Sequence, residues 1–280
     1  MSAAASAPRI TLAGHEVGEG LPLFVIAGPD VIEGLDHALR HAELLQSLTA
    51  RVGVPFVYKS SFDKANRTSG KSFRGPGIDE GLRVLDEVKR RLGVNILTDV
   101  HETSQVTAAA EVADVLQIPA FLCRQTDLVE AVARSGRGVN LKKGQFVSPR
   151  DIVHSVRKAN EAGNPNVLVT ERGASFGYNN LVVDMRGLAL MREAGLVTCF
   201  DATHSVQLPG AGEGTTGGER RFVSLLSRSA AAAGIDALFA EVHEDPDRAP
   251  CDGPCMLTPA QFEATLKDLL AIRRVLGHQP

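Results

Sequence analysis

The residues that bear most directly on chemistry are the cations and polar groups of the segment KSSFDKANRTS, residues 59–69. This segment follows an apolar run at residues 55–58 that is typical of a buried strand. Lys59 and Lys64 offer point charges, and Arg67 adds a planar guanidinium that can bind two phosphate oxygens at once. Most charged loops are simply solvated. We interpret this one as an anion-binding loop because the other expected strand ends carry similar groups.

The composition excludes several classes of protein. The 280-residue chain is 44% hydrophobic with a net charge of −3, so it has no overall basic field to attract nucleic acid. No apolar run approaches the roughly 20 residues of a membrane helix. Residues 1–8 lack the features of a signal peptide and are interpreted as a disordered leader. The four cysteines are scattered, which favours a reduced, cytoplasmic protein.

Apolar and amphipathic segments alternate along the rest of the chain. Strand candidates begin near residues 24, 56, 94, 115, 139, 167, 197 and 238. Helical segments are expected at residues 37–51, 80–92, 106–113, 127–135, 150–162, 181–194, 220–233 and 260–276. The pattern predicts an α/β fold, a (β/α)₈ TIM barrel in a single domain over residues 9–280, with a short β-hairpin in residues 9–19. A doubly wound sheet would normally carry a Gly-rich phosphate turn after its first strand, and the segment after Gly28 is not one.

The elements of such a barrel place its functional groups at one end, in the loops that follow the strands. Charged residues are rarely buried without partners, so eight polar strand ends predict an enzyme site for anionic substrates. The cations there suffice for two phosphate or carboxylate groups: Lys59, Lys64, Arg124, Lys142 and Arg172.

A second group combines one imidazole with three carboxylates. Asp30, His204, Glu241 and Asp252 follow the first, seventh and eighth strands, which are neighbours in a closed barrel. Together they suit either a divalent metal ion or acid–base catalysis around a water molecule.

Cys251 and Cys255 lack a second pair at zinc spacing and are interpreted as structural. Residues 215–219 have a composition shared by mobile lids and ordinary surface loops.

Long motifs in a fixed order carry a family resemblance. They are KSSFDKANR (59–67), FRGPG (73–77), TDVHE (98–102), PAFLCRQTD (119–127), KKGQF (142–146), RGASFGY (172–178) and DATH (201–204). From about residue 21 to about residue 276 the chain resembles the 3-deoxy-D-manno-octulosonate 8-phosphate synthases. The resemblance implies condensation of phosphoenolpyruvate with D-arabinose 5-phosphate and water, with release of phosphate, for lipopolysaccharide synthesis. It also implies a cytoplasmic homotetramer that uses no organic cofactor and binds neither membrane nor nucleic acid.

The resemblance also assigns roles to individual residues. It implies catalytic roles for His204, Lys64, Asp252 and Asp30, and phosphoenolpyruvate binding by Lys59, Lys64, Lys142, Gln145 and Arg172. The pentose phosphate is assigned to Asn66, Arg67 and Thr68, with Phe121 and Arg124 contributed by a neighbouring subunit. Further rim positions are Asp99, Gln117, Pro119 and Ala120.

One position departs from the family pattern. Metal-dependent members have Cys after the first strand and metal-independent members have Asn, whereas this chain has Asp30. Its flanking segments resemble the metal-dependent branch, which favours a divalent ion (Mn, Mg, Zn or Fe) held by Asp30, His204, Glu241 and Asp252. The alternative is that Asp30 imitates the Asn of the metal-free branch.

Two other functions remain open from the sequence. One is the related synthase that condenses phosphoenolpyruvate with erythrose 4-phosphate, against which the KANR and AFLCRQ segments argue. The other is a non-catalytic barrel that binds a sugar phosphate, which would be expected to have lost a rim cation or His204.

Overall fold

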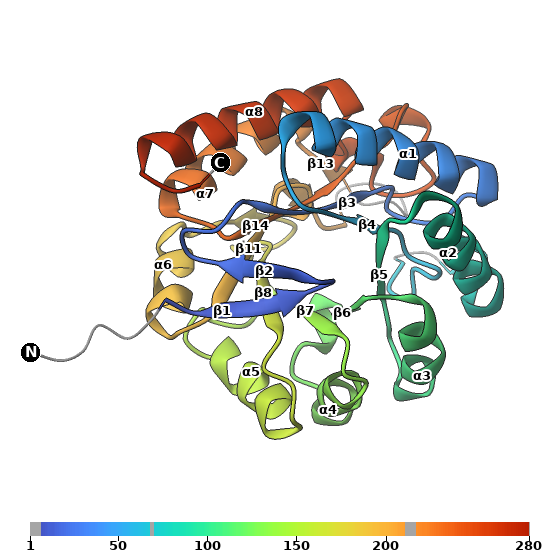
Figure 1. Cartoon of the computed structure of the whole chain (residues 1–280), viewed down its shortest axis with the longest axis horizontal. Coiled ribbons are helices and arrows are strands. Elements are labelled where there is room, and N and C mark those ends of the chain that lie inside the picture. Colours follow the sequence, from blue (N-terminus) through green and yellow to red (C-terminus); the bar gives the residue numbers. More distant parts are fainter. Residues whose placement is uncertain (1–6, 68–69, 211–216, 280) are drawn as a thin grey trace, which may run out of the picture.

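Eight parallel strands close into a barrel in the computed structural model, which describes residues 7–67, 70–210 and 217–279. The order around the barrel is β11-β14-β3-β4-β5-β6-β7-β8, and β11 also pairs with β8, so the sheet has no free edge (Figure 1). The strands are β3 (Phe24–Gly28), β4 (Phe56–Lys59), β5 (Asn95–Asp99), β6 (Val115–Ile118), β7 (Gly138–Lys142), β8 (Val167–Glu171), β11 (Val197–Asp201) and β14 (Ala237–Glu241). The predicted (β/α)₈ TIM barrel is therefore confirmed.

Helices surround the barrel and alternate with its strands (Figure 1). They are α1 (Leu35–Val52), α2 (Ile78–Leu92), α3 (Thr103–Val112), α4 (Thr126–Arg134), α5 (Ile152–Glu161), α6 (Arg186–Glu193), α7 (Val223–Ala233) and α8 (Pro259–Val275). All eight predicted helices are present, but the sixth begins later than expected. Leu181–Val182 forms the strand β10, paired with β9 (Ala174–Ser175), because the helix starts only after Asp184, whose carboxylate accepts the Arg186 N–H at 3.0 Å.

The apolar residues form two cores separated by the strands. The larger core lies between the strands and the helices, where residues such as Val25, Tyr58 and Leu116 meet the apolar faces of the helices. The smaller core fills the barrel interior and includes Phe24 and Phe239. Strands buried on both faces account for the continuous apolar runs in the sequence.

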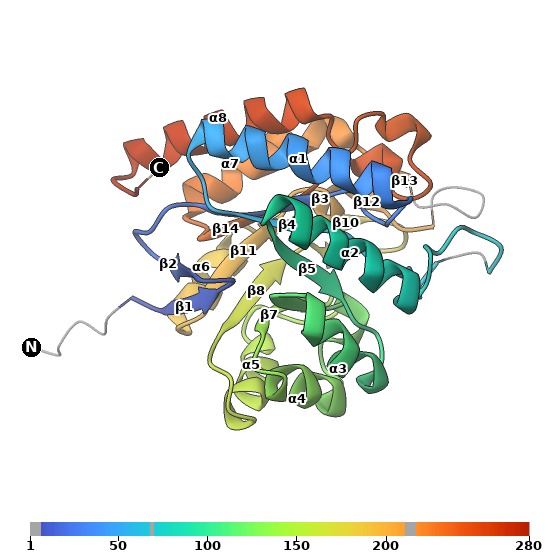
Figure 2. The same ribbon diagram turned by 45° about the vertical axis from the view of Figure 1, so that its right-hand side comes forward.

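The predicted N-terminal hairpin is also confirmed, as β1 (Arg9–Leu12) paired with β2 (His15–Gly18). Leu12 and Val17 are fully buried and belong to the same core as the barrel interior. The Asn95 side chain donates to the Ala13 carbonyl at 3.0 Å, and the Thr11 N–H donates to the Asn166 side chain at 2.9 Å. The hairpin thus closes the end of the barrel away from β12 and β13, as Figure 2 shows.

Shortening a buried side chain of the N-terminal hairpin should therefore lower the stability of the protein. Leu12 is 0% exposed, and replacing a buried leucine by alanine removes transfer free energy and leaves a cavity. We expect Leu12→Ala to lower the free energy of unfolding by about 2–5 kcal/mol, measured by urea denaturation. Glu16→Ala, at an exposed position of the same hairpin, serves as control and should change it little. Equal effects of the two substitutions would show that the hairpin is not part of the core.

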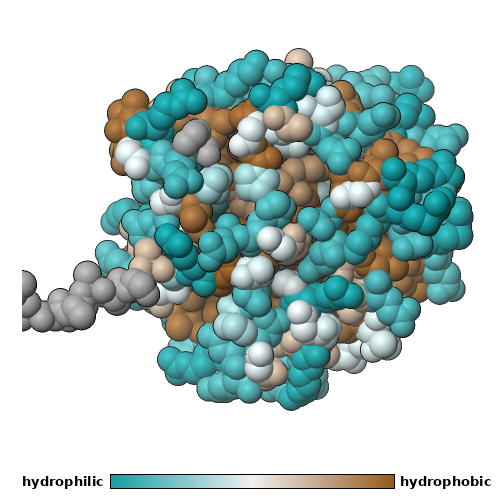
Figure 3. Space-filling view, viewed as in Figure 1, coloured by the Kyte–Doolittle hydropathy of each residue, from teal (hydrophilic) through white to brown (hydrophobic). Residues whose placement is uncertain are grey.

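The surface agrees with the composition. The face drawn in Figure 3 is mainly hydrophilic, and its hydrophobic residues lie in separate patches. Within the described ranges, no helix combines the length and the apolar character needed to cross a membrane. Most of the predicted leader, residues 1–6, lies outside the described residues, and the single domain over 9–280 stays a prediction.

Candidate active site

A cavity of about 250 Å³ opens where the barrel strands feed their following loops. It is lined by the residues that end strands or begin loops on this face, as expected for the fold. Most of the predicted site residues line it: Lys59, Lys64, Asn66, Arg67, Asp99, Gln117, Pro119, Ala120, Phe121, Lys142, Gln145, Arg172, His204, Glu241 and Asp252. The structure therefore brings together groups that are up to 193 positions apart between Lys59 and Asp252.

The floor of the cavity is a buried ionic network around Asp30. The Lys59 ammonium donates to the Asp30 carbonyl at 2.9 Å and to Glu241 Oε1 at 3.1 Å. Lys64 pairs with the Asp30 carboxylate, and Cys251 donates its thiol hydrogen to the same carboxylate. A side chain at Gly28 would collide with the Lys59 backbone, so only glycine lets these two strands approach closely here.

Asp201 organises the opposite wall. Its carboxylate pairs with the Lys142 ammonium, accepts the Thr203 hydroxyl at 3.1 Å, and lies 2.9 Å from His204 Nδ1. Burial alone would raise the pKa of Asp201, but the neighbouring His204 and Lys142 hold it well below its usual range. Burial lowers the pKa of His204 despite Asp201, so its imidazole is neutral at neutral pH. The Asp201 carboxylate also accepts the His204 backbone N–H at 2.9 Å, which holds His204 at this wall.

Two arginines of the cavity each have a buried guanidinium nitrogen without a partner among the described residues. Arg172 donates one nitrogen to Gln207, while its buried Nη1 has no hydrogen-bond partner among the described residues. Arg67 Nε is likewise buried and unpartnered within the part of the chain that the structure describes. Buried donors normally find acceptors, and an unmade bond costs about 1–3 kcal/mol. These guanidinium groups are therefore available to an anion.

The imidazole and the three carboxylates lie together as predicted. Asp30, His204, Glu241 and Asp252 each offer one ligand atom, and these atoms all lie within 4.8 Å of one another. His204 Nε2 is 3.7 Å from Glu241 Oε1 and 3.7 Å from Asp252 Oδ2. Glu241 Oε2 is buried and finds no hydrogen-bond partner in the described structure. An oxygen-rich donor set with one neutral imidazole fits a divalent cation.

The two lysines and the carboxylates also balance charge without an ion. Burial would raise the pKa of Asp30, but Lys64 and Lys59 hold it well below its usual range. Burial and the neighbouring Asp30 raise the pKa of Glu241 to about 8, and the same two causes raise that of Asp252 to about 6. At neutral pH Asp30 is thus ionised and Glu241 holds a proton. An ion bound to Asp30 would compete with Lys64 for the same carboxylate.

Asp252 is held in an uncommon backbone conformation. Its φ is 51°, in the left-handed region that non-glycine residues rarely adopt. The Gln207 side chain donates to its carboxylate at 3.0 Å, and the Cys255 N–H donates to its carbonyl at 2.9 Å. These contacts fix the Asp252 side chain at the cavity wall.

Two of the predicted residues that the structure describes do not line the cavity. Asp30 lies beneath it, fully buried against the lysines, and Arg124 points to the surface. Thr68 lies outside the described residues, as do Thr215 and Thr216 of the predicted lid. The described part of that lid, Gly217–Gly218, forms the strand β13, which pairs with β12 (Gln207–Leu208).

Six further residues line the cavity without an assigned role: His101, Asp201, Gln207, Pro209, Gly210 and Cys251. The first three were expected at strand ends on this face. His101 Nε2 lies 3.0 Å from Asp99, and the position of Asp201 at a strand end pointed to it. The Cys251 thiol contacts Asp30 at the cavity wall, and neither Cys251 nor Cys255 belongs to the possible metal-ligand groups found among the described residues. Cys251 comes close to Asp30 through the fold of the loop after β14, and the spacing of residues in the sequence does not predict this contact.

Comparison with known proteins agrees with this geometry. The model of the DAHP synthetase I family matches residues 7–274. A 2-dehydro-3-deoxyphosphooctonate aldolase of Magnetococcus marinus is 58% identical over 269 residues, which cover 96% of this chain and 94% of that relative. A protein of the same name from Synechococcus sp. is 56% identical over 261 residues, which cover 93% of this chain and 92% of that relative. Another from Geobacter sp. is 55% identical over 270 residues, which cover 96% of this chain and 98% of that relative. The chain belongs to the DAHP synthetase I family.

Proposed function

We propose that this protein condenses phosphoenolpyruvate with D-arabinose 5-phosphate and water to give 3-deoxy-D-manno-octulosonate 8-phosphate and phosphate. The observation that carries the proposal concerns Arg67 and Arg172, which share one cavity with three lysines. Each has a buried guanidinium nitrogen that finds no hydrogen-bond partner among the described residues. Two separate cationic groups suit two anionic substrates. The name shared by the relatives and the motifs at residues 59–67 and 119–127 support the choice of sugar.

Phosphoenolpyruvate carries a carboxylate and a phosphate on a small skeleton, so it needs cations on more than one side. Lys142 is the last residue of β7, Arg172 directly follows the neighbouring strand β8, and Lys64 belongs to the loop after β4. Gln145 Oε1 is buried without a hydrogen-bond partner among the described residues and adds a polar contact on the same side. Arg67 and Asn66 take the sugar phosphate, at the edge of the cavity where Phe121 is exposed.

The reaction forms one carbon–carbon bond and one carbon–oxygen bond. The methylene carbon of phosphoenolpyruvate bonds to the aldehyde carbon of the sugar, whose oxygen takes up a proton. Water bonds to the carbon that carries the phosphate ester and loses one proton, which balances the proton taken up by the aldehyde oxygen. The ester bond then breaks as the new hydroxyl becomes the ketone, and its proton leaves with phosphate. In the protein without an ion, His204 and Asp252 lie 3.7 Å apart and can accept a proton of the water, and the proton held by Glu241 is available for the aldehyde oxygen.

A divalent ion on Asp30, His204, Glu241 and Asp252 is part of the proposal. When bound, it would act as a Lewis acid for the aldehyde or for water. The carboxylates favour Mn²⁺ or Mg²⁺ over the softer ions that a cysteine thiolate would prefer.

The test is phosphate release from phosphoenolpyruvate with and without D-arabinose 5-phosphate. Release that depends on the pentose phosphate supports the proposal. Faster turnover with erythrose 4-phosphate would assign the chain to the related synthase instead. Binding of the sugar phosphate without any release of phosphate would indicate a non-catalytic barrel.

Assembly is expected to be required for activity. Phe121 is 54% exposed at the cavity edge, and Arg124, three residues later, is exposed as well. Both side chains are therefore accessible to the substrate site of a neighbouring subunit. We expect sedimentation to show a closed homo-oligomer, a tetramer. Arg124→Ala should weaken the use of the sugar phosphate while the tetramer stays intact. The control Arg157→Ala, at another exposed position, should leave the use of the sugar phosphate unchanged. A fully active monomer would contradict this expectation.

A further inference from the structure

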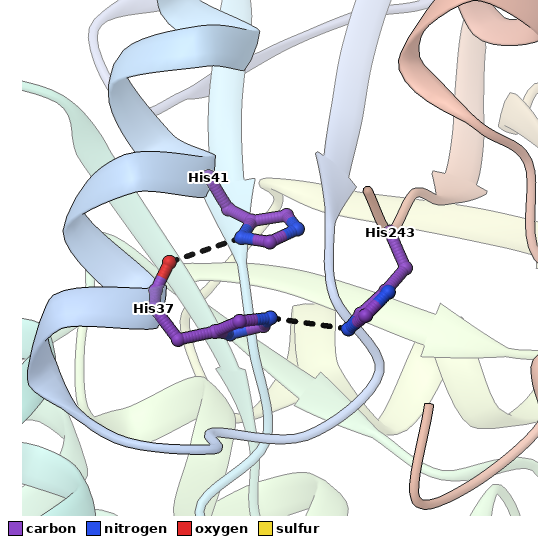
Figure 4. Close-up of side chains that lie close together, drawn as sticks. All are labelled: His37, His41 and His243. Carbon is purple, nitrogen blue, oxygen red and sulfur yellow. Dashed lines mark hydrogen bonds between the residues drawn. The ribbon is translucent and has the colours of Figure 1, made fainter. Parts of the chain in front are cut away.

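Three histidines and a glutamate cluster beside the active site without any role in the proposed reaction. His37 and His41 lie one helical turn apart in α1, and His243 follows β14, so all three rings face a common point (Figure 4). One nitrogen from each of the three rings lies within 4.8 Å of the others, and Glu33 lies at the same place. His41 and His243 are only 1% and 5% exposed, respectively.

The spacing of three of these groups matches a metal site. His37 Nε2 lies 3.1 Å from His243 Nε2, and Glu33 Oε1 lies 3.0 Å from His243 Nε2 and 3.6 Å from His37 Nε2. Nitrogen and oxygen ligands bind Zn²⁺ at about 2.0–2.2 Å in tetrahedral geometry, which places neighbouring ligand atoms about 3.3–3.6 Å apart. Two of the three separations lie slightly below that range, and the third lies at its upper end. An ion can therefore be accommodated with small movements of the side chains.

The hydrogen bonds of the rings decide which nitrogens can bind an ion. His41 has no free lone pair, because Nδ1 donates to the His37 carbonyl at 3.0 Å and Nε2 accepts the Glu244 N–H at 3.1 Å. His41 thus packs against the site and leaves coordination to the other three groups.

Coordination has one identifiable cost. His243 Nδ1 accepts the Asp245 N–H at 2.9 Å, and a ring that binds a metal through Nε2 carries its proton on Nδ1. That hydrogen bond must be given up when the ion binds. Asp245 is exposed, so water can accept its N–H instead.

We propose that Glu33, His37 and His243 form a second metal site, which takes a divalent transition ion, Zn²⁺ foremost, with a fourth position open to water. Two imidazoles and one carboxylate favour Zn²⁺, Cu²⁺ or Ni²⁺ over Mg²⁺ and Ca²⁺, which prefer all-oxygen sites. Glu33 lies in the loop after Asp30, His37 lies in the first turn of α1, and His243 lies in the segment after Glu241. A bound ion would cross-link the two segments that carry these active-site carboxylates. The proposal does not depend on the proposed reaction.

The experiment measures Zn²⁺ binding in a variant whose active-site cluster is disabled, His204→Gln, against a chromophoric chelator. We expect one equivalent of Zn²⁺ to remain bound in that background. Adding His37→Gln or Glu33→Gln should weaken binding at least tenfold, since even outer-shell partners of a metal are worth about 10–100-fold. The control His154→Gln, on the exposed face of α5, should leave the affinity unchanged.

Two readouts separate a metal site from a loss of structure. Thermal melting without metal checks that each variant is folded, and Zn²⁺ should raise the melting temperature of the His204→Gln background but not that of the His37→Gln double variant. Co²⁺ in the same background should show the strong visible absorption of a four-coordinate ion. Absence of the equivalent in the His204→Gln background, or equal affinity after His37→Gln and His154→Gln, would overturn the proposal.

Discussion

Arg67→Ala is expected to weaken the use of D-arabinose 5-phosphate far more than that of phosphoenolpyruvate. Arg67 Nε is buried without a partner in the described structure, and its Nη2 makes only a long contact of 3.4 Å to the Pro250 carbonyl. The protein therefore leaves most of this guanidinium to a ligand. A lost charge-assisted contact is worth about 2–4 kcal/mol, which corresponds to an increase in KM of about 30- to 700-fold.

The same loop offers a matched control. Arg74 belongs to the loop between β4 and α2 but pairs with Asp63 at the surface and does not line the cavity. Steady-state kinetics of Arg74→Ala should resemble those of the unmodified enzyme for both substrates. Equal weakening of both substrates by Arg67→Ala would mean that Arg67 binds phosphoenolpyruvate or supports the whole loop.

The barrel could be predicted because its strands are buried on both faces and its helices on one. Runs such as residues 24–28 and 167–171 are continuously apolar until they end at the rim, and the intervening segments are amphipathic. The start of α6 could not be predicted in this way. Leu181 is buried in the short strand β10, and an apolar residue near a helix start looks the same in either structure.

The site could be predicted as a set of residues but not as a set of contacts. Barrel topology alone brings the ends of β3, β11 and β14 together, so Asp30, His204 and Glu241 had to be near one another. Which cation meets which carboxylate depends on side-chain rotamers. The pairing of Lys64 with Asp30 was therefore left open, and the contact of Cys251 was missed.

The partner of Asp30, either a metal ion or a lysine, decides how strongly chelation should lower turnover. Three carboxylates in a buried site repel one another unless a cation or a proton intervenes. In the structure Lys64 and Lys59 face Asp30, and the raised pKa of Glu241, to about 8, supplies the proton. A divalent ion would take over both tasks, release Lys64 toward the cavity and favour the ionised form of Glu241. The donor set thus suits both states, and only the ion adds Lewis acidity.

Exhaustive chelation is accordingly expected to lower turnover at least about 100-fold, because Lewis-acid stabilisation is worth several kcal/mol and 1.36 kcal/mol is a factor of ten. Mn²⁺ or Mg²⁺ should restore activity better than Zn²⁺ or Cd²⁺, and that order should reverse in Asp30→Cys, whose thiolate prefers softer ions. Asp30→Asn keeps the shape of the side chain, removes its charge and should yield an enzyme that turns over after chelation. Undiminished turnover of the chelated, unmodified protein would show that the lysines alone balance Asp30. In that case Asp30→Cys should create metal dependence from His204, Glu241 and Asp252, the three ligands already in place.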